Sequence, residues 1–209
     1  MLLGIDEVRK SPAIGSIVVC GFVCDSKDLS YLYDELGVRD SKKIQYKIER
    51  LAKVLDKYPH KVFKIPAEEI SVSSNINALE GEYIKEIIKW ADSLFKIDQI
   101  FIDSLTANPD ITRSYIKMRD KRFVIEIEAD NKYVPVMCAS IIAKDRSDIE
   151  MAILRKEFDC GSGEPADKKT REFIFNAIKE NDQNKLKIIR KKWLTFKREY
   201  DKIHQNTIP

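Results

Sequence analysis

The order of the apolar segments constrains the fold of this chain more than any other feature. Two early segments, Leu2–Ile5 and Ile14–Cys24, have the composition of buried strands, and the short connection between them predicts a β-hairpin. Further strands are predicted at Lys61–Ile65, Ile97–Asp103 and Phe123–Ile127, with helical segments between them. Two strands followed by alternating helices and strands predict an α/β fold with one mixed sheet and a helical tail.

The helices are predicted from apolar positions that recur at helical spacing and from residues that start or stop a helix. Gly37 stops the first helix, and Ser41 is expected to cap the second, which runs on through Leu55. The predicted helices lie at Leu29–Leu36, Ser41–Leu55, Asn75–Leu94, Ile111–Met118, Val136–Phe158, Lys168–Glu180 and Asn184–Ile203.

The length of 209 residues fits one compact domain, and the chain contains no internal repeat and no linker rich in proline, glycine or serine. We therefore expect a single domain over residues 1–209, with a core over about 1–158 and a helical extension over about 159–209. Nothing in the sequence marks an oligomer interface, so we expect a monomer.

The composition is that of a soluble globular protein, with 44% hydrophobic and 34% charged residues. No apolar run reaches the ~18 residues that cross a bilayer, which excludes a membrane-spanning protein. The first six residues lead directly into an acidic pair and do not form a signal peptide, so we expect a cytoplasmic location.

Cysteine and histidine offer little chemistry in this chain. The four cysteines form no CxxC pair and have no histidine nearby, so they are expected to be small buried side chains. Only His60 and His204 are present. Acid–base or metal chemistry must therefore rest on carboxylates.

Carboxylates stand at the ends of three predicted strands: Asp6 and Glu7 after the first, Asp103 after a later one and Asp130 after the last. If these strands are neighbours, four carboxylates converge, and divalent cations such as Mg²⁺ or Mn²⁺ would relieve their repulsion. Adjacent residues on a strand face opposite sides, so Asp6 and Glu7 could share a site only if the strand ends or bulges there, which nearby Pro12 permits. Acids after strands also form caps and turns, so spacing alone predicts only a possible metal-dependent phosphoryl-transfer enzyme.

Basic residues are concentrated near the end of the chain. The segment Asn184–Lys202 holds eight of them against only Glu199 and Asp201. Such a run is either the solvated face of a helix or a surface that meets phosphate, and the sequence leaves both interpretations open.

A series of motifs carries a resemblance to a known family. The chain resembles ribonuclease HII from residue 4 to about residue 198, and its last motif resembles the archaeal members. In chain order the matching motifs are Gly4–Glu7 with Pro12–Gly15, Val38–Lys43, Asn77 with Glu80, Ile102–Asp103, Ala129–Tyr133 with Ala139–Lys144, Asp159–Gly163 with Pro165–Thr170, and Arg190–Trp193.

The resemblance implies a ribonuclease H-like fold, in which a mixed five-stranded sheet is flanked by helices and followed by a helical extension. It also implies that Asp6, Glu7, Asp103 and Asp130 hold two Mg²⁺ or Mn²⁺ ions. The implied substrates are RNA–DNA hybrids and duplex DNA that contains ribonucleotides, and RNA–DNA junctions are a further possible substrate. The implied products carry 3′-hydroxyl and 5′-phosphate ends.

The resemblance further implies contacts with the nucleic-acid backbone by Ser41, Lys42, Lys43, Ser140 and Lys144. Each of these residues also has a simpler interpretation. Ser41 could be a helix cap, Ser140 could bond within its own helix, Lys144 could pair with an acid, and the two remaining lysines could be solvated.

Two positions depart from the family pattern. Arg9-Lys10-Ser11 replaces the Gly-Arg-Gly that approaches the ribose 2′-hydroxyl, and Glu164 replaces a tyrosine that stacks at the RNA–DNA junction. We therefore expect a weakened preference for single embedded ribonucleotides, with Lys10 in the role of the family's arginine. The alternatives are a catalytically inactive hybrid-binding protein and, less favoured, another metal nuclease on the same fold.

Overall fold

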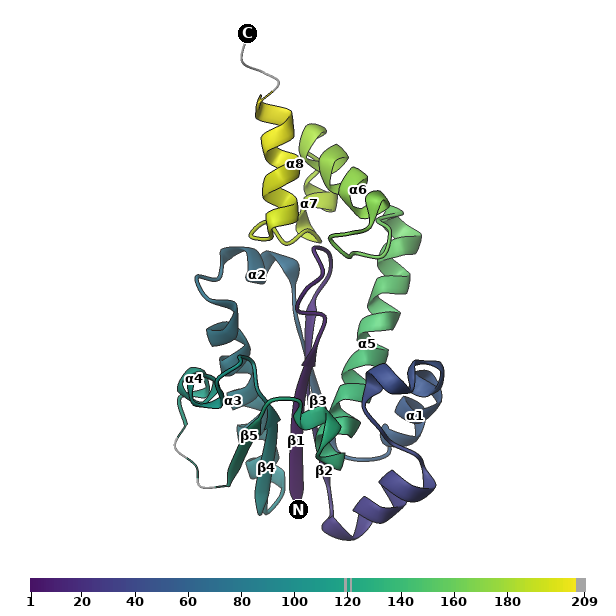
Figure 1. Ribbon diagram of the computed structural model, residues 1–209, viewed down its shortest axis with the longest axis vertical. Coiled ribbons are helices and arrows are strands. Elements are labelled where there is room, and N and C mark those ends of the chain that lie inside the picture. The colour runs from purple at the N-terminus through teal and green to yellow at the C-terminus, as the bar shows by residue number, and fades with distance from the viewer. Residues whose placement is uncertain (119, 121, 206–209) are drawn as a thin grey trace. The chain divides into compact units, whose positions relative to one another are not determined.

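A computed structural model describes residues 1–118, 120 and 122–205 (Figure 1). Its five-stranded sheet has the order β3-β2-β1-β4-β5. Strand β1 pairs antiparallel with β2 and parallel with β4, which pairs parallel with β5. The sheet is thus mixed, and the predicted hairpin and fold class are confirmed. The strands are β1 Leu2–Val8, β2 Ile17–Cys24, β3 His60–Ile65, β4 Gln99–Asp103 and β5 Phe123–Glu126.

Helices make up most of the remaining described chain. Short 3₁₀ helices occupy 26–28, 41–43, 45–47 and 129–131, and a π-helical turn spans Tyr31–Glu35. The α-helices are α1 Ile48–Leu55, α2 Ala67–Val72, α3 Ile76–Leu94, α4 Pro109–Ile116, α5 Val134–Phe158, α6 Lys168–Lys179, α7 Gln183–Lys187 and α8 Leu194–Gln205.

Four details differ from the helices predicted from sequence. The predicted helix Ser41–Leu55 is two short 3₁₀ helices followed by α1. Helix α2 was not predicted; Pro66 is its N-cap, and acids in its first turn suit the positive end of the helix dipole. The predicted cap Ser41 is wrong, because the carboxylate of Asp40 accepts the Lys42 N–H instead. The predicted helix Asn184–Ile203 is two helices, α7 and α8, because residues 188–193 form other bonds that are described below.

The chain divides into two compact units, which are described separately. The sheet unit comprises residues 1–8, 18–63 and 75–146, and the helical unit comprises residues 9–17, 64–74 and those from 147 onward. The helical unit therefore includes the segments 9–17 and 64–74, which lie far before residue 158 in the sequence. The single domain with a core to about residue 158 remains a prediction.

Helices cover both faces of the sheet in the sheet unit (Figure 1). The face that carries Leu2, Val8 and the even-numbered residues of β2 packs against α1 and the start of α5. A side chain at Gly4 would overlap the Pro135 backbone of α5, so glycine brings this helix directly onto β1. On the opposite face a side chain at Gly21 would overlap Ile87 of α3. Helix α5 is thereby fixed beside the end of β1 that bears the acids.

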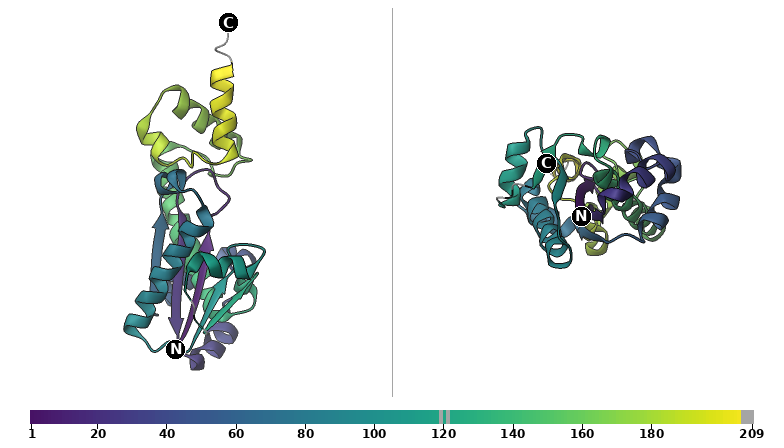
Figure 2. Two further views of the ribbon diagram at one scale, coloured as in Figure 1. Left: turned by 90° about the vertical axis from the view of Figure 1, so that its left-hand side faces the viewer. Right: turned by 90° about the horizontal axis from the view of Figure 1, so that it is seen from below.

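The helical unit has its own apolar core. Ala13 and Ile14 pack with Met151 of α5 and Phe173 of α6, together with Cys160, Ile174, Ala177, Leu186 and Ile189. Figure 2 shows α6, α7 and α8 of this unit gathered together. The segment 9–17 is thus part of a packed unit and is held from several sides.

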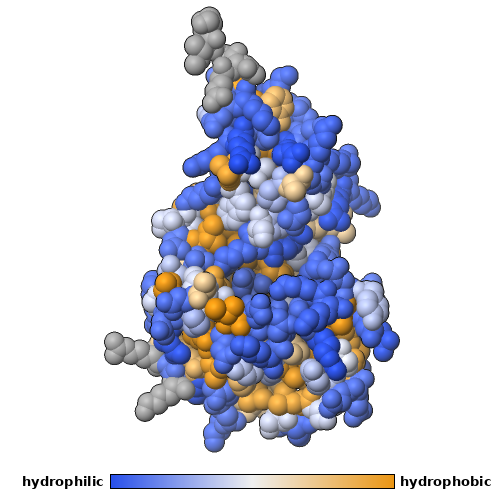
Figure 3. All heavy atoms as spheres, viewed as in Figure 1, coloured by the Kyte–Doolittle hydropathy of each residue, from blue (hydrophilic) through white to orange (hydrophobic). Residues whose placement is uncertain are grey.

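The prediction for the cysteines is confirmed, since Cys20, Cys24, Cys138 and Cys160 are all buried with free thiols. No helix among the described residues is long and apolar enough to cross a membrane. On the face shown in Figure 3, hydrophilic side chains predominate and hydrophobic ones form several separate patches.

Candidate metal centre and substrate loops

Three of the four predicted acids meet at one point of the sheet unit. One carboxylate oxygen from each of Asp6, Glu7 and Asp103 lies within 4.8 Å of the other two. Asp6 is buried and the other two side chains are half-buried. Three carboxylates at this separation form an all-oxygen donor set, which suits a hard divalent cation.

The adjacent residues Asp6 and Glu7 reach this point without the strand end or bulge that was predicted. Strand β1 continues to Val8, and its pairing with β2 is regular through both acids. Its pairing with β4, however, extends only to Ile5 and Ile102. Beyond that pair, the β4 side of β1 is open, so the long Glu7 side chain can bend around the strand toward Asp6 and Asp103.

The fourth acid, Asp130, lies in the 3₁₀ helix that follows β5 and is 3% exposed. Its Oδ2 is 3.4 Å from Nζ of Lys42. Its Oδ1 is buried and has no hydrogen-bond partner among the described residues. A buried carboxylate oxygen without a donor is costly, and a bound cation would remove that cost.

The proximity of these acids changes their protonation. Burial raises the pKa of Asp6 well above its usual value, and the charges of Asp103 and Asp130 raise it further. Burial raises the pKa of Asp103 to about 6, even though its Oδ1 accepts the Ala129 N–H at 2.7 Å. Both shifts mean that burial and the neighbouring acids disfavour the deprotonated carboxylates, which a bound cation would stabilise.

Ser41 and Ser140 lie behind the acids. Both are buried, and their hydroxyls are 3.0 Å apart. Ser140 also hydrogen-bonds the carboxylate of Asp6 and lowers its pKa, against the effect of burial. Ser140 therefore orients a candidate metal ligand, and its bonds extend beyond its own helix. The predicted backbone contacts of the two serines remain predictions.

The lysines of the same motif are exposed. Lys42 approaches Asp130, and Lys43 donates to Asn131 Oδ1 at 2.8 Å. Side-chain exposures of 75% for Lys42 and 66% for Lys43 leave both able to meet a phosphate. Lys144 lies half-buried on α5.

The positions at which the motif resemblance implies a departure, Arg9-Lys10-Ser11 and Glu164, lie in the helical unit. Arg9 has a φ of 65°, in the left-handed region that favours glycine. The backbone of this position thus keeps a glycine-like conformation although the residue is arginine.

Residues between α7 and α8 hold the segment 9–16 in place. Arg190 is fully buried and donates to the carbonyls of Gly15 at 2.8 Å and Lys10 at 3.0 Å. Trp193 Nε1 donates to the Ser11 carbonyl at 2.8 Å, and Ile189 forms a β-bridge with Ile14. The basic residues of this segment therefore include one, Arg190, that serves as a buried structural clamp.

The loop 161–164 borders the same segment. Ala13 N–H donates to the Gly163 carbonyl at 2.8 Å, and Arg9 Nη2 lies 3.3 Å from the Ser162 carbonyl. Asp167 accepts the Ser162 N–H at 2.6 Å, and Thr170 Oγ1 accepts the Gly163 N–H at 2.9 Å. The loop is thus fixed from both sides, and its last residue, Glu164, has an exposed side chain.

Comparison with known proteins identifies the family. The ribonuclease HII family model matches residues 3–196. Ribonuclease HII of Sulfolobus acidocaldarius is 36% identical, covering 92% of this chain and 91% of its own. The crystal structure of ribonuclease H2 from Pyrococcus horikoshii OT3 has a TM-score of 0.84 and 29% identity, covering 98% of this chain and 99% of that one. The chain belongs to the ribonuclease HII family.

Ribonuclease HII from Archaeoglobus fulgidus, solved in complex with PCNA, is a further similar structure, with a TM-score of 0.77 and 33% identity. It covers 92% of this chain and 95% of that one. The resemblance inferred from the motifs is therefore confirmed, and the chain is a member of a family of ribonucleases.

Several supporting residues of this chain were missed from the sequence. Arg190 and Trp193 were noted as parts of a motif but given no role, and neither Asp40 nor Asp167 was singled out. The signal for the two aspartates was available: each lies just before a helix and two residues ahead of the N–H that it accepts. The role of Arg190 had no local signal, because its partners are 175 and 180 residues away.

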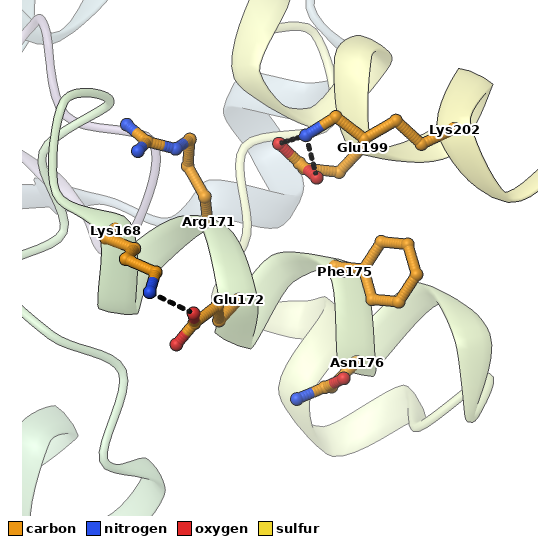
Figure 4. Close-up of a pocket in the computed structure, with 7 residues that line it drawn as sticks. All are labelled: Lys168, Arg171, Glu172, Phe175, Asn176, Glu199 and Lys202. Atoms are coloured by element: carbon orange, nitrogen blue, oxygen red, sulfur yellow. Dashed lines mark hydrogen bonds and ion pairs between the residues drawn. The ribbon is translucent and has the colours of Figure 1, made fainter.

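A pocket of about 470 Å³ in the helical unit lies between α6 and α8 (Figure 4). Lys202 pairs there with Glu199, and Lys168 pairs with Glu172. The pocket shares no residue with the acidic cluster. Two of the three basic side chains that line the pocket are therefore paired with acids.

Proposed function

We propose that this ribonuclease HII cuts the RNA strand of RNA–DNA hybrids with two Mg²⁺ or Mn²⁺ ions held by Asp6, Glu7, Asp103 and Asp130. The observation that carries the proposal is the meeting of three carboxylates within 4.8 Å. The buried, unpartnered Oδ1 of Asp130 supports a place for the fourth acid in the same site.

When bound, the two cations would activate water and stabilise the leaving oxygen, giving 3′-hydroxyl and 5′-phosphate ends. The residues of the chain bind and orient. The four acids are the candidate ligands, and Ser140 fixes the carboxylate of Asp6. The exposed ammonium groups of Lys42 and Lys43 supply positive charge for the phosphates of the duplex.

The proposed substrate preference follows from the altered loops. Arg9-Lys10-Ser11 and Glu164 would contact the duplex where the family pattern has Gly-Arg-Gly and tyrosine. Added side chains hinder close approach of the backbone, and a carboxylate cannot stack on a base. We expect cleavage of continuous hybrids and a weakened preference for single ribonucleotides or junctions, with Lys10 in the arginine's place.

Cleavage of two substrates tests the proposal. Purified protein with Mg²⁺ or Mn²⁺ should cut a continuous hybrid, and cut a duplex with one ribonucleotide less efficiently. Asp103→Asn should abolish both activities, whereas Asp201→Asn, at an exposed position of α8, should preserve them. Failure of the wild-type protein to cut either duplex would overturn the proposal, and binding without cleavage would favour the inactive alternative. Efficient incision beside the single ribonucleotide would overturn only the substrate preference.

We also propose that the protein acts as a cytoplasmic monomer in DNA replication and repair. The expectation of a monomer rests on the lack of any sequence feature of an oligomer interface. Light scattering coupled to size-exclusion chromatography tests it, and a mass near twice 24.2 kDa would contradict it.

A further inference from the structure

Arg9, in the first of the two altered segments, contacts the loop that carries Glu164, the second alteration. The guanidinium of Arg9 covers Gly163, the residue just before Glu164. A Cβ at Gly163 would lie only 2.8 Å from Arg9 Nη2, and the same nitrogen is 3.3 Å from the Ser162 carbonyl. Gly163 has a φ of 83°, so this close approach depends on a glycine in the left-handed region.

The charges of the two side chains are complementary. Arg9 is half-buried, and burial lowers the pKa of its guanidinium. Among the charged neighbours that oppose this effect, Glu164 acts most strongly, ahead of Asp148. A lone carboxylate on a loop that meets nucleic acid would repel the phosphates, and a guanidinium beside it cancels that repulsion.

From this geometry we infer that Arg9 and Glu164 form one coupled pair that determines substrate preference. The effect of either residue on duplex binding therefore depends on the presence of the other. Arg9 retains the glycine-like backbone of the loop, covers Gly163 and neutralises the carboxylate that replaces the stacking ring. The inference rests on the proposed function, because it assumes that these loops meet the duplex.

A double-mutant cycle on duplex binding tests the coupling. Arg9→Gly, Glu164→Tyr and the double variant are compared with the wild type for binding to a continuous hybrid and to a duplex with one ribonucleotide. Binding is measured by fluorescence anisotropy without divalent metal, so the result does not depend on cleavage. Asn181→Gly is the matched control, since it relieves another left-handed residue of the helical unit outside these loops.

We expect Arg9→Gly to weaken binding of both duplexes by about tenfold, because the charge of Glu164 is then unopposed. In the Glu164→Tyr background, the same change should weaken binding by about twofold at most. Only the double variant should gain affinity for the single-ribonucleotide duplex relative to the continuous hybrid. The ratio of the two affinities is measured on one preparation, so partial unfolding of a variant cancels.

If the effects of Arg9→Gly and Glu164→Tyr on duplex affinity simply multiply in the double variant, the coupling is overturned. It is also overturned if the wild type binds neither duplex. Coupled binding in a protein that cleaves neither substrate with Mg²⁺ or Mn²⁺ would instead support the pair and overturn the proposed nuclease activity. The two failures are therefore distinguishable.

Discussion

Ser140 supports a buried carboxylate of the acidic cluster from within α5. It hydrogen-bonds Asp6, and its hydroxyl lies 3.0 Å from that of Ser41. Residues that orient a metal ligand commonly affect metal affinity nearly as much as the ligand does. Ser41 and Ser140 should therefore affect the affinity for metal more than the affinity for the duplex.

We predict that Ser140→Ala raises the Mg²⁺ concentration needed for half-maximal cleavage by about tenfold or more, because Asp6 loses its orienting bond. Affinity for the hybrid without metal should change little. Ser147→Ala is the control: its serine is equally buried on the same helix, and its hydroxyl has no partner among the described residues. An unchanged Mg²⁺ requirement in Ser140→Ala would contradict the assigned role.

At the scale of single residues, the sequence could predict that Asp6, Glu7 and Asp103 come together, because acids near the ends of neighbouring strands converge. It could not predict how Glu7 joins them. That depends on the register of β1 against β4, whose pairing extends only to Ile5 and Ile102. It also could not predict the partner of Ser41, which is 99 residues away.

Among the elements, the connection between α7 and α8 differs most from its prediction. Lysine and arginine favour helices, so the basic run around Lys187–Lys192 predicts a continuous helix. Tertiary bonds override this preference, since the backbone of Ile189 pairs with Ile14 and Arg190 is buried. The strands were predicted well, because buried strands carry their signal locally in β-branched apolar residues.

The clamp formed by Arg190 gives a prediction for this connection. Arg190→Lys should lower the free energy of unfolding by about 2 kcal/mol, because one ammonium cannot reach both carbonyls that the planar guanidinium spans. The loosened segment 9–16 should raise KM for the hybrid more than it lowers kcat, with an unchanged Mg²⁺ requirement.

Chemical denaturation and steady-state cleavage measure these effects, with Arg198→Lys as the control. Arg198 is exposed on α8, so this change should alter neither stability nor KM. If Arg190→Lys behaves as the control does, residues 9–16 are not held by this side chain.

For the whole molecule, the two compact units do not follow the order of the sequence. Ile14 packs against Cys160, Phe173 and Ile189, all of which lie beyond the predicted core boundary near residue 158. A chain cut after Phe158 would keep all four acids but expose Ile14 and Met151, at a cost of about 2 kcal/mol each.

We therefore predict that residues 1–158 alone bind the hybrid poorly and cleave it little, although the acidic cluster is complete. Thermal unfolding and cleavage compared with the full chain provide the measurement. Full activity of the shortened protein would show that the segment from residue 159 is a dispensable extension.

The acidic cluster should also make the stability of the whole protein depend on pH and metal together. Burial raises the pKa of Asp6, and it raises that of Asp103 to about 6. The folded protein thus holds protons that the unfolded chain releases near pH 4. Stability without metal should fall as the pH rises from about 4 through 6, by roughly 2–3 kcal/mol for Asp103.

Divalent cations bind the deprotonated carboxylates, so their stabilising effect must change with pH in the opposite direction. We predict that Mn²⁺ raises Tm by about 5 °C or more at pH 8 and by much less at pH 5. Asp103→Asn should raise Tm without metal at pH 8, because a buried charge is removed, and should abolish most of the Mn²⁺ response. Asp201→Asn should keep the wild-type response. Since protons and cations compete for the same oxygens, an equal Mn²⁺ shift at both pH values would mean that the ion binds elsewhere.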